Sequence, residues 1–420
     1  MATIQSIRGT KDILPADVNK WQELENIARK VSNQFGYQEI RTPIFEKTEV
    51  FSRGVGDNTD IVNKEMYTFA DRSGESLTLR PEQTASLVRS VIQNNLITEN
   101  TPTRLFYIGS YFRYERPQKG RFREFHQYGI ECINSPYPES DVEVILLAIN
   151  FIKRLGITDY KLKLNSIGNT ETRNKYKTAL TDYLQQNKHN LSNESQARIE
   201  TNTLRVLDSK NNNDIEIIAS APSILDYLDN ESNEHFNKVK EILDIANINY
   251  EITPTLVRGL DYYSHTVFEF QSTYLGAQDA FGGGGRYNNL FSQLGGKDIP
   301  SVGFAMGIER LLLILENIKE NNTQPQIDIL ICTTNSDYLK YATELSLFVR
   351  QNCPNIICIS DVNRRSLKSL LREANKLNSR YVIIIGETEA ANNTITLKYM
   401  QENKEQITIN KNKLIEILTA

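Results

Sequence analysis

Three arginines occur in segments that contain other unusual residues and could bind phosphate. Arg113 lies in FRYERPQKGRFRE, Arg258 in LVRGLDYY and Arg310 in GIER. A guanidinium group grips phosphate oxygens bidentately and keeps its charge at physiological pH. The sequence has no glycine-rich loop ending in Gly-Lys-Ser/Thr, so bound ATP would have to be held by these arginines. Most single arginines are surface charges, but three such segments favour a phosphate site.

Polar residues also alternate around two aromatic-rich segments. In strands, Arg113 and Glu115 share one face of the first segment, and Gln127, Gly129 and Glu131 share one face of the second. Gly129 leaves room for a small polar ligand, to which Gln127 could donate or accept a hydrogen bond and from which Glu131 could accept one. A hairpin face exposed to solvent is the alternative.

The segment LVRGLDYYSHTVFEF combines an arginine with paired tyrosines. In a regular strand Arg258 and Tyr263 would point to opposite faces, but Gly259 permits a bend. Tyr262 and Tyr263 could shape a pocket or simply pack in a core. The run Gly282 to Gly285 is either a flexible turn or a stretch of backbone that a substrate can approach closely.

These residues require elements that position them. The apolar spacing between Leu14 and Phe35 predicts an amphipathic helix, and residues 37–51 form an extended segment interrupted at Pro43. Residues 104–133 predict two strands around a polar loop, Arg116 to Arg121. Arg310 stands at the start of a further helix, where a helix N-terminus already favours anions.

Composition divides the chain into several parts. Residues 1–168 and 250–320 are rich in strand signals, whereas residues 169–249 are polar and helical and are interpreted as an insertion. Residues 321–326 read as a linker. Residues 327–420 alternate short apolar strands with helices, which is typical of a small α/β domain with a parallel-type sheet.

Basic residues recur at every fourth position of a predicted helix in the last domain. Its opposite face is apolar. The basic residues are Arg364, Lys368, Arg372, Lys376 and Arg380. Residues 327–420 carry 12 basic and 10 acidic residues, although the whole chain has a net charge of −4. A solvated face is the usual explanation, but the regular spacing of charges that are all positive favours contact with RNA.

Several classes of protein are disfavoured. No stretch has the roughly 18 apolar residues of a membrane span, and the N-terminus lacks a signal peptide, so we expect a cytoplasmic protein without a membrane partner. The net negative charge argues against a chain coated with nonspecific nucleic-acid-binding charge but does not exclude a local basic face, and we expect no DNA partner. The cysteines form no C-x-x-C pair, which predicts reduced buried thiols and no metal held by the protein. They are Cys132, Cys332, Cys353 and Cys358.

The same segments resemble the signature motifs of a known family. The stretch around Pro43, FRYERPQKGRFREFHQYGIE and GFAMGIER resemble motifs 1, 2 and 3 of class II aminoacyl-tRNA synthetases. LVRGLDYY, FGGGGRY and the loop LRPEQTA resemble the histidine-specific motifs of bacterial-type histidyl-tRNA synthetases. The resemblance covers nearly the whole chain. It implies an α+β catalytic domain with an antiparallel sheet, a helical insertion, a C-terminal α/β anticodon-binding domain and a homodimer.

The resemblance also implies a reaction. L-histidine and ATP would form histidyl-adenylate and pyrophosphate, and histidine would then pass to the 3′ end of tRNA(His). ATP is a substrate, and Mg²⁺ arrives with it. Arg113 and Arg258 would clasp the α-phosphate as the catalytic residues, and Arg310 would hold the distal phosphates. Glu115 would complete the ATP site.

Further residues are assigned by the same resemblance. Glu82 and Thr84 would hold the ammonium of histidine, with assistance from Gln127. Glu131 and Tyr263 would recognise the two ring nitrogens. The other histidine-binding residues implied are Gln83 and Tyr262. The residues expected to contact tRNA are Arg116, Gln118, Arg121, Arg123, Arg364, Lys368 and Arg372.

Two alternatives remain at this point. One is a catalytically silent paralogue that regulates histidine biosynthesis, but such paralogues lack the C-terminal domain. The other is a different class II synthetase, which LVRGLDYY disfavours. ATP–pyrophosphate exchange with each amino acid separates all three.

Overall fold

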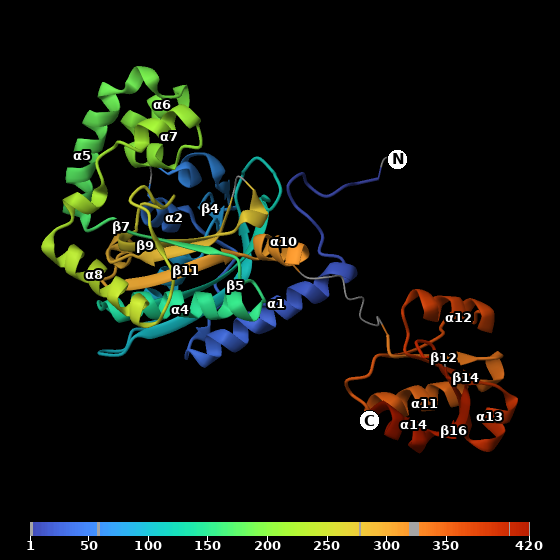
Figure 1. Cartoon of the computed structure of the whole chain (residues 1–420). Coiled ribbons are helices and arrows are strands. Elements are labelled where there is room, and N and C mark those ends of the chain that lie inside the picture. Colours follow the sequence, from blue (N-terminus) through green and yellow to red (C-terminus); the bar gives the residue numbers. More distant parts are fainter. Residues whose placement is uncertain (1–2, 57–58, 277–278, 319–326, 403, 420) are drawn as a thin grey trace. The chain divides into compact units, whose positions relative to one another are not determined.

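The computed structural model describes residues 3–56, 59–276, 279–318, 327–402 and 404–419. The chain forms two compact units, Met1–Lys319 and Glu320–Ala420 (Figure 1). The predicted linker 321–326 lies outside the described residues. Among the residues that are described, no helix has the length and apolar character needed to cross a membrane.

An eight-stranded sheet forms the centre of the first unit. The inner strands pair antiparallel, while the short edge strands β1 and β8 pair in parallel with their neighbours. This arrangement confirms the expected antiparallel sheet. The strand order is β1 (Gln38–Glu39), β5 (Thr103–Phe112), β6 (Glu124–Ile133), β11 (Ser301–Gly307), β10 (Ala280–Arg286), β9 (Ser264–Gln271), β7 (Lys161–Ser166) and β8 (Glu251–Ile252).

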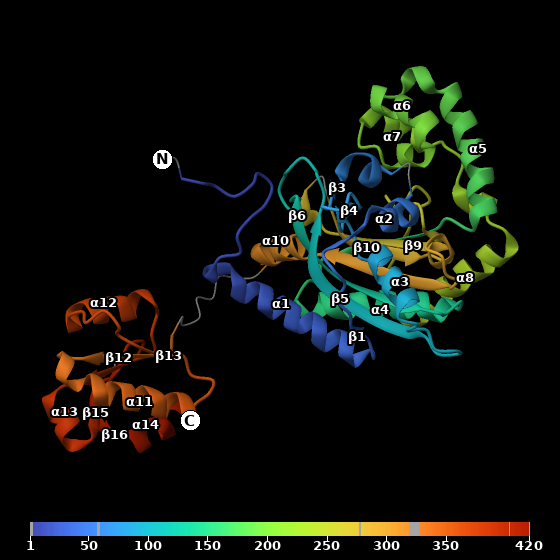
Figure 2. The ribbon, with the colours of Figure 1, turned by 180° about the vertical axis from the view of Figure 1, so that it is seen from behind.

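Helices pack against this sheet through one large hydrophobic core. Figures 1 and 2 show α1 and α4 side by side along the sheet. The predicted N-terminal helix is confirmed, since α1 has proline at its first position and ends just before Gly36, which has a φ of +77°. The helices of this core are α1 (Pro15–Gln34), α4 (Pro138–Arg154), α8 (Asn230–Ile245) and α10 (Ile308–Ile318).

A smaller antiparallel sheet lies near the start of the chain. It consists of β2 (Phe45–Lys47), β4 (Ser76–Leu79) and β3 (Tyr67–Ala70). The expectation of an extended segment throughout residues 37–51 is wrong at its end, because α2 (Thr48–Val55) begins there. Val50, Phe51, Gly54 and Val55 are buried, and this helical spacing overrides the strand signals.

The region after β7 is helical, as its composition predicts. It contains α5 (Thr170–Gln186), α6 (Asn193–Thr201) and α7 (Asn212–Ile218), which gather in one part of the first unit (Figure 1). The next helix, α8, instead packs against α4 and contributes Phe236, Val239 and Leu243 to the core of the main sheet. The predicted bounds of the insertion, 169–249, stay a prediction.

The second unit has a five-stranded mixed sheet. Its first three strands are parallel, as expected, but β15 and β16 continue the sheet antiparallel and were not predicted. The order is β13 (Cys358–Ser360), β12 (Ile329–Thr333), β14 (Tyr381–Ile385), β15 (Thr394–Tyr399) and β16 (Ile407–Asn410). The helices are α11 (Leu339–Asn352), α12 (Leu367–Lys376), α13 (Glu387–Asn392) and α14 (Lys411–Thr419). All four cysteines of the chain are free and buried.

Candidate active site

Two adjoining cavities lie in the first unit. The smaller one, of about 160 Å³, contains Glu82, Thr84, Glu131, Tyr262 and Tyr263 in its lining. The larger one, of about 800 Å³, reaches the loop after β5, the start of α10 and the helical region. The side chains that line both cavities include Arg113, Gln127, Arg258 and Tyr263. The structure therefore brings most of the predicted site residues together.

Glu131 is held by hydroxyl groups inside the small cavity. Its Oε1 accepts a hydrogen bond of 2.8 Å from Thr84, and its Oε2 accepts one of 2.6 Å from Tyr287. Tyr107 approaches Oε1 at 3.4 Å. Burial raises the pKa of Glu131 to about 8. Sequence analysis missed both tyrosines, although Tyr287 directly follows the glycine run and its arginine.

The prediction that three residues share one face of β6 is correct, but the prediction of space for a ligand beside Gly129 is wrong. Gln127, Gly129 and Glu131 pair with alternate residues of β11, so they share one face. A Cβ on Gly129 would lie 2.4 Å from the phenol ring of Tyr107, so that ring occupies the space. Gly303 of β11 makes the room instead, because a Cβ there would overlap the carboxylate of Glu131.

The loop before α3 (Thr84–Gln93) presents Glu82 to the small cavity. The Glu82 carboxylate accepts the backbone N–H groups of Thr84 and Ala85, each at 2.7 Å, at the start of the helix. The hydroxyl of Tyr262 lies 3.4 Å from the same carboxylate. Burial raises the pKa of Glu82, while the two backbone hydrogen bonds favour its charged form.

Gln83 lines the same cavity, but its amide is engaged elsewhere. Its Nε2 donates to Thr42 at 2.9 Å, and its Oε1 accepts from Tyr111 at 3.0 Å and from Arg80 at 3.2 Å. These contacts fix the loop that carries Glu82. The geometry thus favours a structural role for Gln83 over the predicted contact with histidine.

Arg113 and Glu115 lie in the hairpin loop and not on a strand, so their predicted common strand face is wrong. β5 ends at Phe112, and the backbone N–H of Arg113 makes one further bond across the hairpin, to the carbonyl of Arg123 at 2.9 Å. Nε of Arg113 donates to the carbonyl of Pro81 at 2.9 Å, and its guanidinium lies 5.1 Å from the centre of the Phe125 ring. Both Arg113 and Glu115 still line the larger cavity.

Arg258 lies in an irregular segment before β9, which begins at Ser264, so Arg258 and Tyr263 are not held on opposite faces of a regular strand. Its Nη1 donates to Glu269 at 2.8 Å. Its Nε is buried and has no hydrogen-bond partner among the described residues. The glycine run is a central strand, β10, and not a turn. A Cβ on Gly283 would lie 2.6 Å from Nη1 of Arg258, so glycine lets the arginine approach.

Arg310 occupies the predicted place in the first turn of α10 and lines the larger cavity. Its Nη1 donates to the carbonyl of Ala280. The preceding Glu309 accepts the backbone N–H of His126 at 3.0 Å and lies 2.9 Å from Nδ1 of the same histidine. Glu309 therefore ties the helix that carries Arg310 to strand β6.

The residues of the hairpin loop that are expected to bind tRNA differ in their exposure and in their contacts with other side chains. Arg116 and Gln118 are exposed on the hairpin loop. Arg121 instead lines the larger cavity and pairs with Glu115 at 3.3 Å. The guanidinium of Arg123 lies over the Tyr114 ring at 4.0 Å. Arg121 and Arg123 thus contribute to the local structure of the loop.

The basic stripe of the second unit is shorter than predicted. Lys368, Arg372 and Lys376 lie on α12 and are exposed, but the helix begins only at Leu367 and ends at Lys376. Arg364 precedes it with a φ of +52°, and Arg380 follows it and pairs with Asp328 at 3.4 Å. Both are also exposed.

The antiparallel sheet, the arginines from the hairpin loop and from the helix after β11, and the separate C-terminal α/β unit define a class II aminoacyl-tRNA synthetase. A family model described as histidyl-tRNA synthetase matches residues 9–311, and one described as anticodon binding domain matches residues 326–420. The chain belongs to the histidyl-tRNA synthetase family.

Individual relatives agree with this assignment. The histidine–tRNA ligase of Halothermothrix orenii is 46% identical over 98% of each chain, and that of a Geobacillus species is 47% identical over 95% of each chain. The crystal structure of apo S. aureus histidyl-tRNA synthetase has a TM-score of 0.82 and 35% identity, and the match covers 100% of both chains.

Proposed function

We propose that the two cavities bind L-histidine and ATP and join them as histidyl-adenylate, after which histidine is transferred to the 3′ end of tRNA(His). The chain is a histidine–tRNA ligase by family. The observation that carries the residue assignment is the position of Glu131. It lies buried in a small polar cavity that opens onto Arg113 and Arg258 in the larger one.

Histidine fits the chemistry of the small cavity. Glu82, Thr84 and Gln127 offer oxygen atoms that accept from the ammonium, while Glu131 and Tyr263 are proposed to meet the two ring nitrogens. An N–H of the imidazole that donates to Glu131 would favour its ionised form over the neutral acid. A side chain without ring nitrogens would leave these buried groups unpaired, so it would be rejected strongly.

ATP is assigned to the larger cavity. Arg113 and Arg258 are proposed to hold the α-phosphate on two sides while the histidine carboxylate attacks it and pyrophosphate leaves. Arg310 would neutralise the distal phosphates, and Phe125 offers a flat surface to the purine. Mg²⁺ would enter as part of the substrate, bound to ATP. The chemistry is positioning and charge stabilisation.

Glu115 is assigned to the ATP site through its neighbours. It pairs with Arg121 at 3.3 Å and lies 4.0 Å from Arg113, so it orients two of the cations that line the larger cavity. We therefore propose that its main effect on ATP binding is to hold these arginines in place.

Recognition of tRNA is proposed for two exposed surfaces. Arg116 and Gln118 lie on the hairpin loop of the first unit, next to residues that line the larger cavity. Lys368 and Arg372, with Arg364 preceding them, belong to the second unit, for which we propose the domain bounds 327–420. Cations at such positions bind the RNA backbone by releasing counterions.

A homodimer is proposed from the small sheet. Ile44, Phe45 and Phe69 are 48%, 53% and 46% exposed, although they are large and apolar. Such a patch is typical of a surface that a partner covers, and a second copy of the chain is the partner that class II motif 1 implies. We also propose that the enzyme works in the cytoplasm, in keeping with its free cysteines.

Two substitutions test the residue assignment separately. Arg258→Ala should reduce histidine-dependent pyrophosphate exchange by about 10²- to 10³-fold while calorimetric binding of histidine survives. Glu131→Ala should abolish measurable histidine binding with the fold intact by circular dichroism. Normal exchange by the first variant or normal histidine affinity of the second would overturn the respective assignment.

A further inference from the structure

A residue of the helical region reaches the wall of the histidine cavity. Arg173, in the first turn of α5, donates from Nη1 to the carbonyl oxygens of Asp261 and Tyr263, each at 2.9 Å. A terminal guanidinium nitrogen carries two N–H groups, so each carbonyl can receive one. These two carbonyls flank Tyr262, whose side chain lines the small cavity.

The start of α5 is fixed to the strand that follows the same tyrosines. The side chain of Asn169 accepts the backbone N–H of Thr172 at 2.9 Å and caps the helix. The backbone N–H of His265 donates to the carbonyl of Gly168 at 2.8 Å. The N-terminus of α5 is therefore held beside the beginning of β9, which fixes the backbone position of Arg173.

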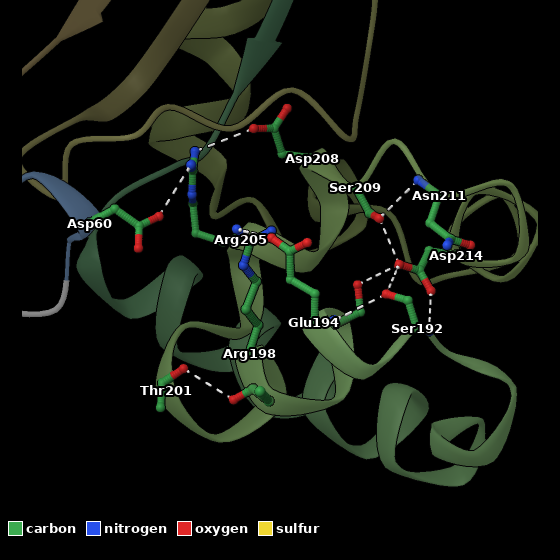
Figure 3. Close-up of polar contacts among 12 residues, drawn as sticks. Asp60, Ser192, Glu194, Arg198, Thr201, Arg205, Asp208, Ser209, Asn211 and Asp214 are labelled. Carbon is green, nitrogen blue, oxygen red and sulfur yellow. Dashed lines mark hydrogen bonds and ion pairs between the residues drawn. The ribbon is translucent and has the colours of Figure 1, made fainter. Parts of the chain in front are cut away.

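A second arginine of the helical region lies near the same segment. Arg205 pairs with Asp60 at 3.7 Å and with Asp208 at 3.3 Å, as Figure 3 shows. Nη1 of Arg205 would be 3.5 Å from a Cβ placed on Gly259. The helical region thus approaches the segment before β9 at two points.

The helical region also has internal polar bonds that give Arg205 a defined position. The carboxylate of Asp214 accepts hydrogen bonds from the hydroxyls of Ser192 at 2.7 Å and Ser209 at 2.6 Å (Figure 3). It also accepts one from the hydroxyl of Ser195 at 2.5 Å. Asp214 is fully buried. This cluster joins three separate turns of the region, one of which directly follows the turn that carries Arg205 and Asp208.

The segment that carries the tyrosines needs such support. Residues 257–263 form neither helix nor strand. The backbone N–H of Asp261 donates to the carbonyl of Val55 at 3.1 Å on one side, and the Arg173 guanidinium binds the segment from the other. Tyr262 and Tyr263 are nevertheless buried, so their rings require a fixed backbone.

We infer that Arg173 is a positioning residue for histidine recognition: from the helical region, it holds the carbonyls around Tyr262 so that the two tyrosines close the histidine cavity. The inference rests on the proposed function, because it takes the small cavity as the histidine site. Arg173 acts on the histidine site through the backbone, and its side chain also belongs to the lining of the larger cavity but not of the small one. Its loss should therefore weaken binding of histidine more than binding of ATP.

Arg173→Ala tests this in the full-length enzyme. The histidine dissociation constant from calorimetry should rise by about tenfold, while the KM for ATP in pyrophosphate exchange stays within about twofold. Arg173→Lys keeps a charged donor and should retain an affinity closer to that of the original enzyme. The matched control is Lys175→Ala on the same helix. Lys175 pairs with the exposed Glu171 at 2.8 Å, and its loss should change neither constant.

Three results would overturn the inference. The histidine dissociation constant could be unchanged in Arg173→Ala, or the alanine and lysine variants could lose histidine affinity equally. In the third, the KM for ATP would rise as much as the histidine dissociation constant. If Arg173→Ala does not fold, Arg173→Gln is measured in its place with the same criteria. Absence of histidine-dependent exchange in the unsubstituted enzyme would instead refute the proposed function, so the two failures are distinguishable.

Discussion

Arg258 donates a hydrogen bond of 2.8 Å from Nη1 to Oε2 of Glu269, and this bond directs the guanidinium towards the space that the two cavities share. The other oxygen of Glu269 accepts from Gln271 at 2.8 Å. Glu269 and Gln271 are alternate residues of β9, so both point to the same side of the sheet. Arg258, the proposed catalytic arginine, comes from an irregular segment, but its orientation is set by a regular strand.

Glu269→Ala should therefore slow adenylate formation by about 10- to 100-fold, because Arg258 loses the partner that aims it. Histidine affinity should change little, since Glu269 does not line the small cavity. Single-turnover formation of the adenylate is the measurement. The control is Glu241→Ala, which removes only an exposed ion pair with Lys238. An unchanged rate for Glu269→Ala would show that Arg258 is positioned by other contacts.

Tyr287→Phe should raise the histidine dissociation constant on the order of tenfold. The substitution removes the hydroxyl that donates to Glu131 at 2.6 Å and leaves that buried oxygen with one partner fewer. Titration calorimetry measures the effect. The exposed Tyr274 provides the control, and its change to phenylalanine should have no effect. Equal affinities in Tyr287→Phe and the original enzyme would contradict the role given to Glu131.

The stability of the ligand-free enzyme should depend on pH through Glu131. Burial raises the pKa of this carboxyl from 4.5 to about 8, so between these values the folded state binds a proton that the unfolded chain has lost. The contribution to the free energy of unfolding is fully present below about pH 4.5 and is lost as pH rises through about 8. Glu131→Gln should flatten this part of the profile in urea denaturation. The same slope in both proteins would refute the shift.

Charge reversal on α12 should weaken tRNA binding and spare adenylate formation. Lys368→Glu combined with Arg372→Glu removes two exposed cations of the second unit, whereas the cavities lie in the first. Each lost phosphate contact should lower the slope of log affinity against log salt by about 0.7 to 0.9. Filter binding at several salt concentrations measures this. An unchanged slope would identify the basic residues as a solvated face.

Local patterns in the sequence were sufficient for some parts of the site. The period of two along β6 placed Gln127 and Glu131 on one face, and the apolar spacing after Gly307 placed Arg310 in the first turn of a helix. Both inferences need only neighbours in sequence. The position of Arg113 was different, because where β5 ends depends on how the hairpin loop packs.

Other parts depended on contacts between distant segments. Tyr107 fills the space at Gly129 because β5 and β6 pair in that register. Tyr287 reaches Glu131 from the position that follows β10, a strand two places away from β6 in the sheet. Arg173 meets the carbonyls on either side of Tyr262 only because α5 starts beside β9. The spacing of neighbouring residues in the sequence does not predict contacts between such distant segments. The family motifs identified the residues that are proposed to touch substrate, while the residues that hold them in place required the fold.

The central claim is that the small cavity selects histidine for activation at the neighbouring arginines. ATP–pyrophosphate exchange, measured with each standard amino acid in turn, tests this claim most directly. We predict exchange with histidine alone, since only its ring satisfies Glu131 and Tyr263 together. Exchange at a comparable rate with a different amino acid, or none with histidine, would contradict it.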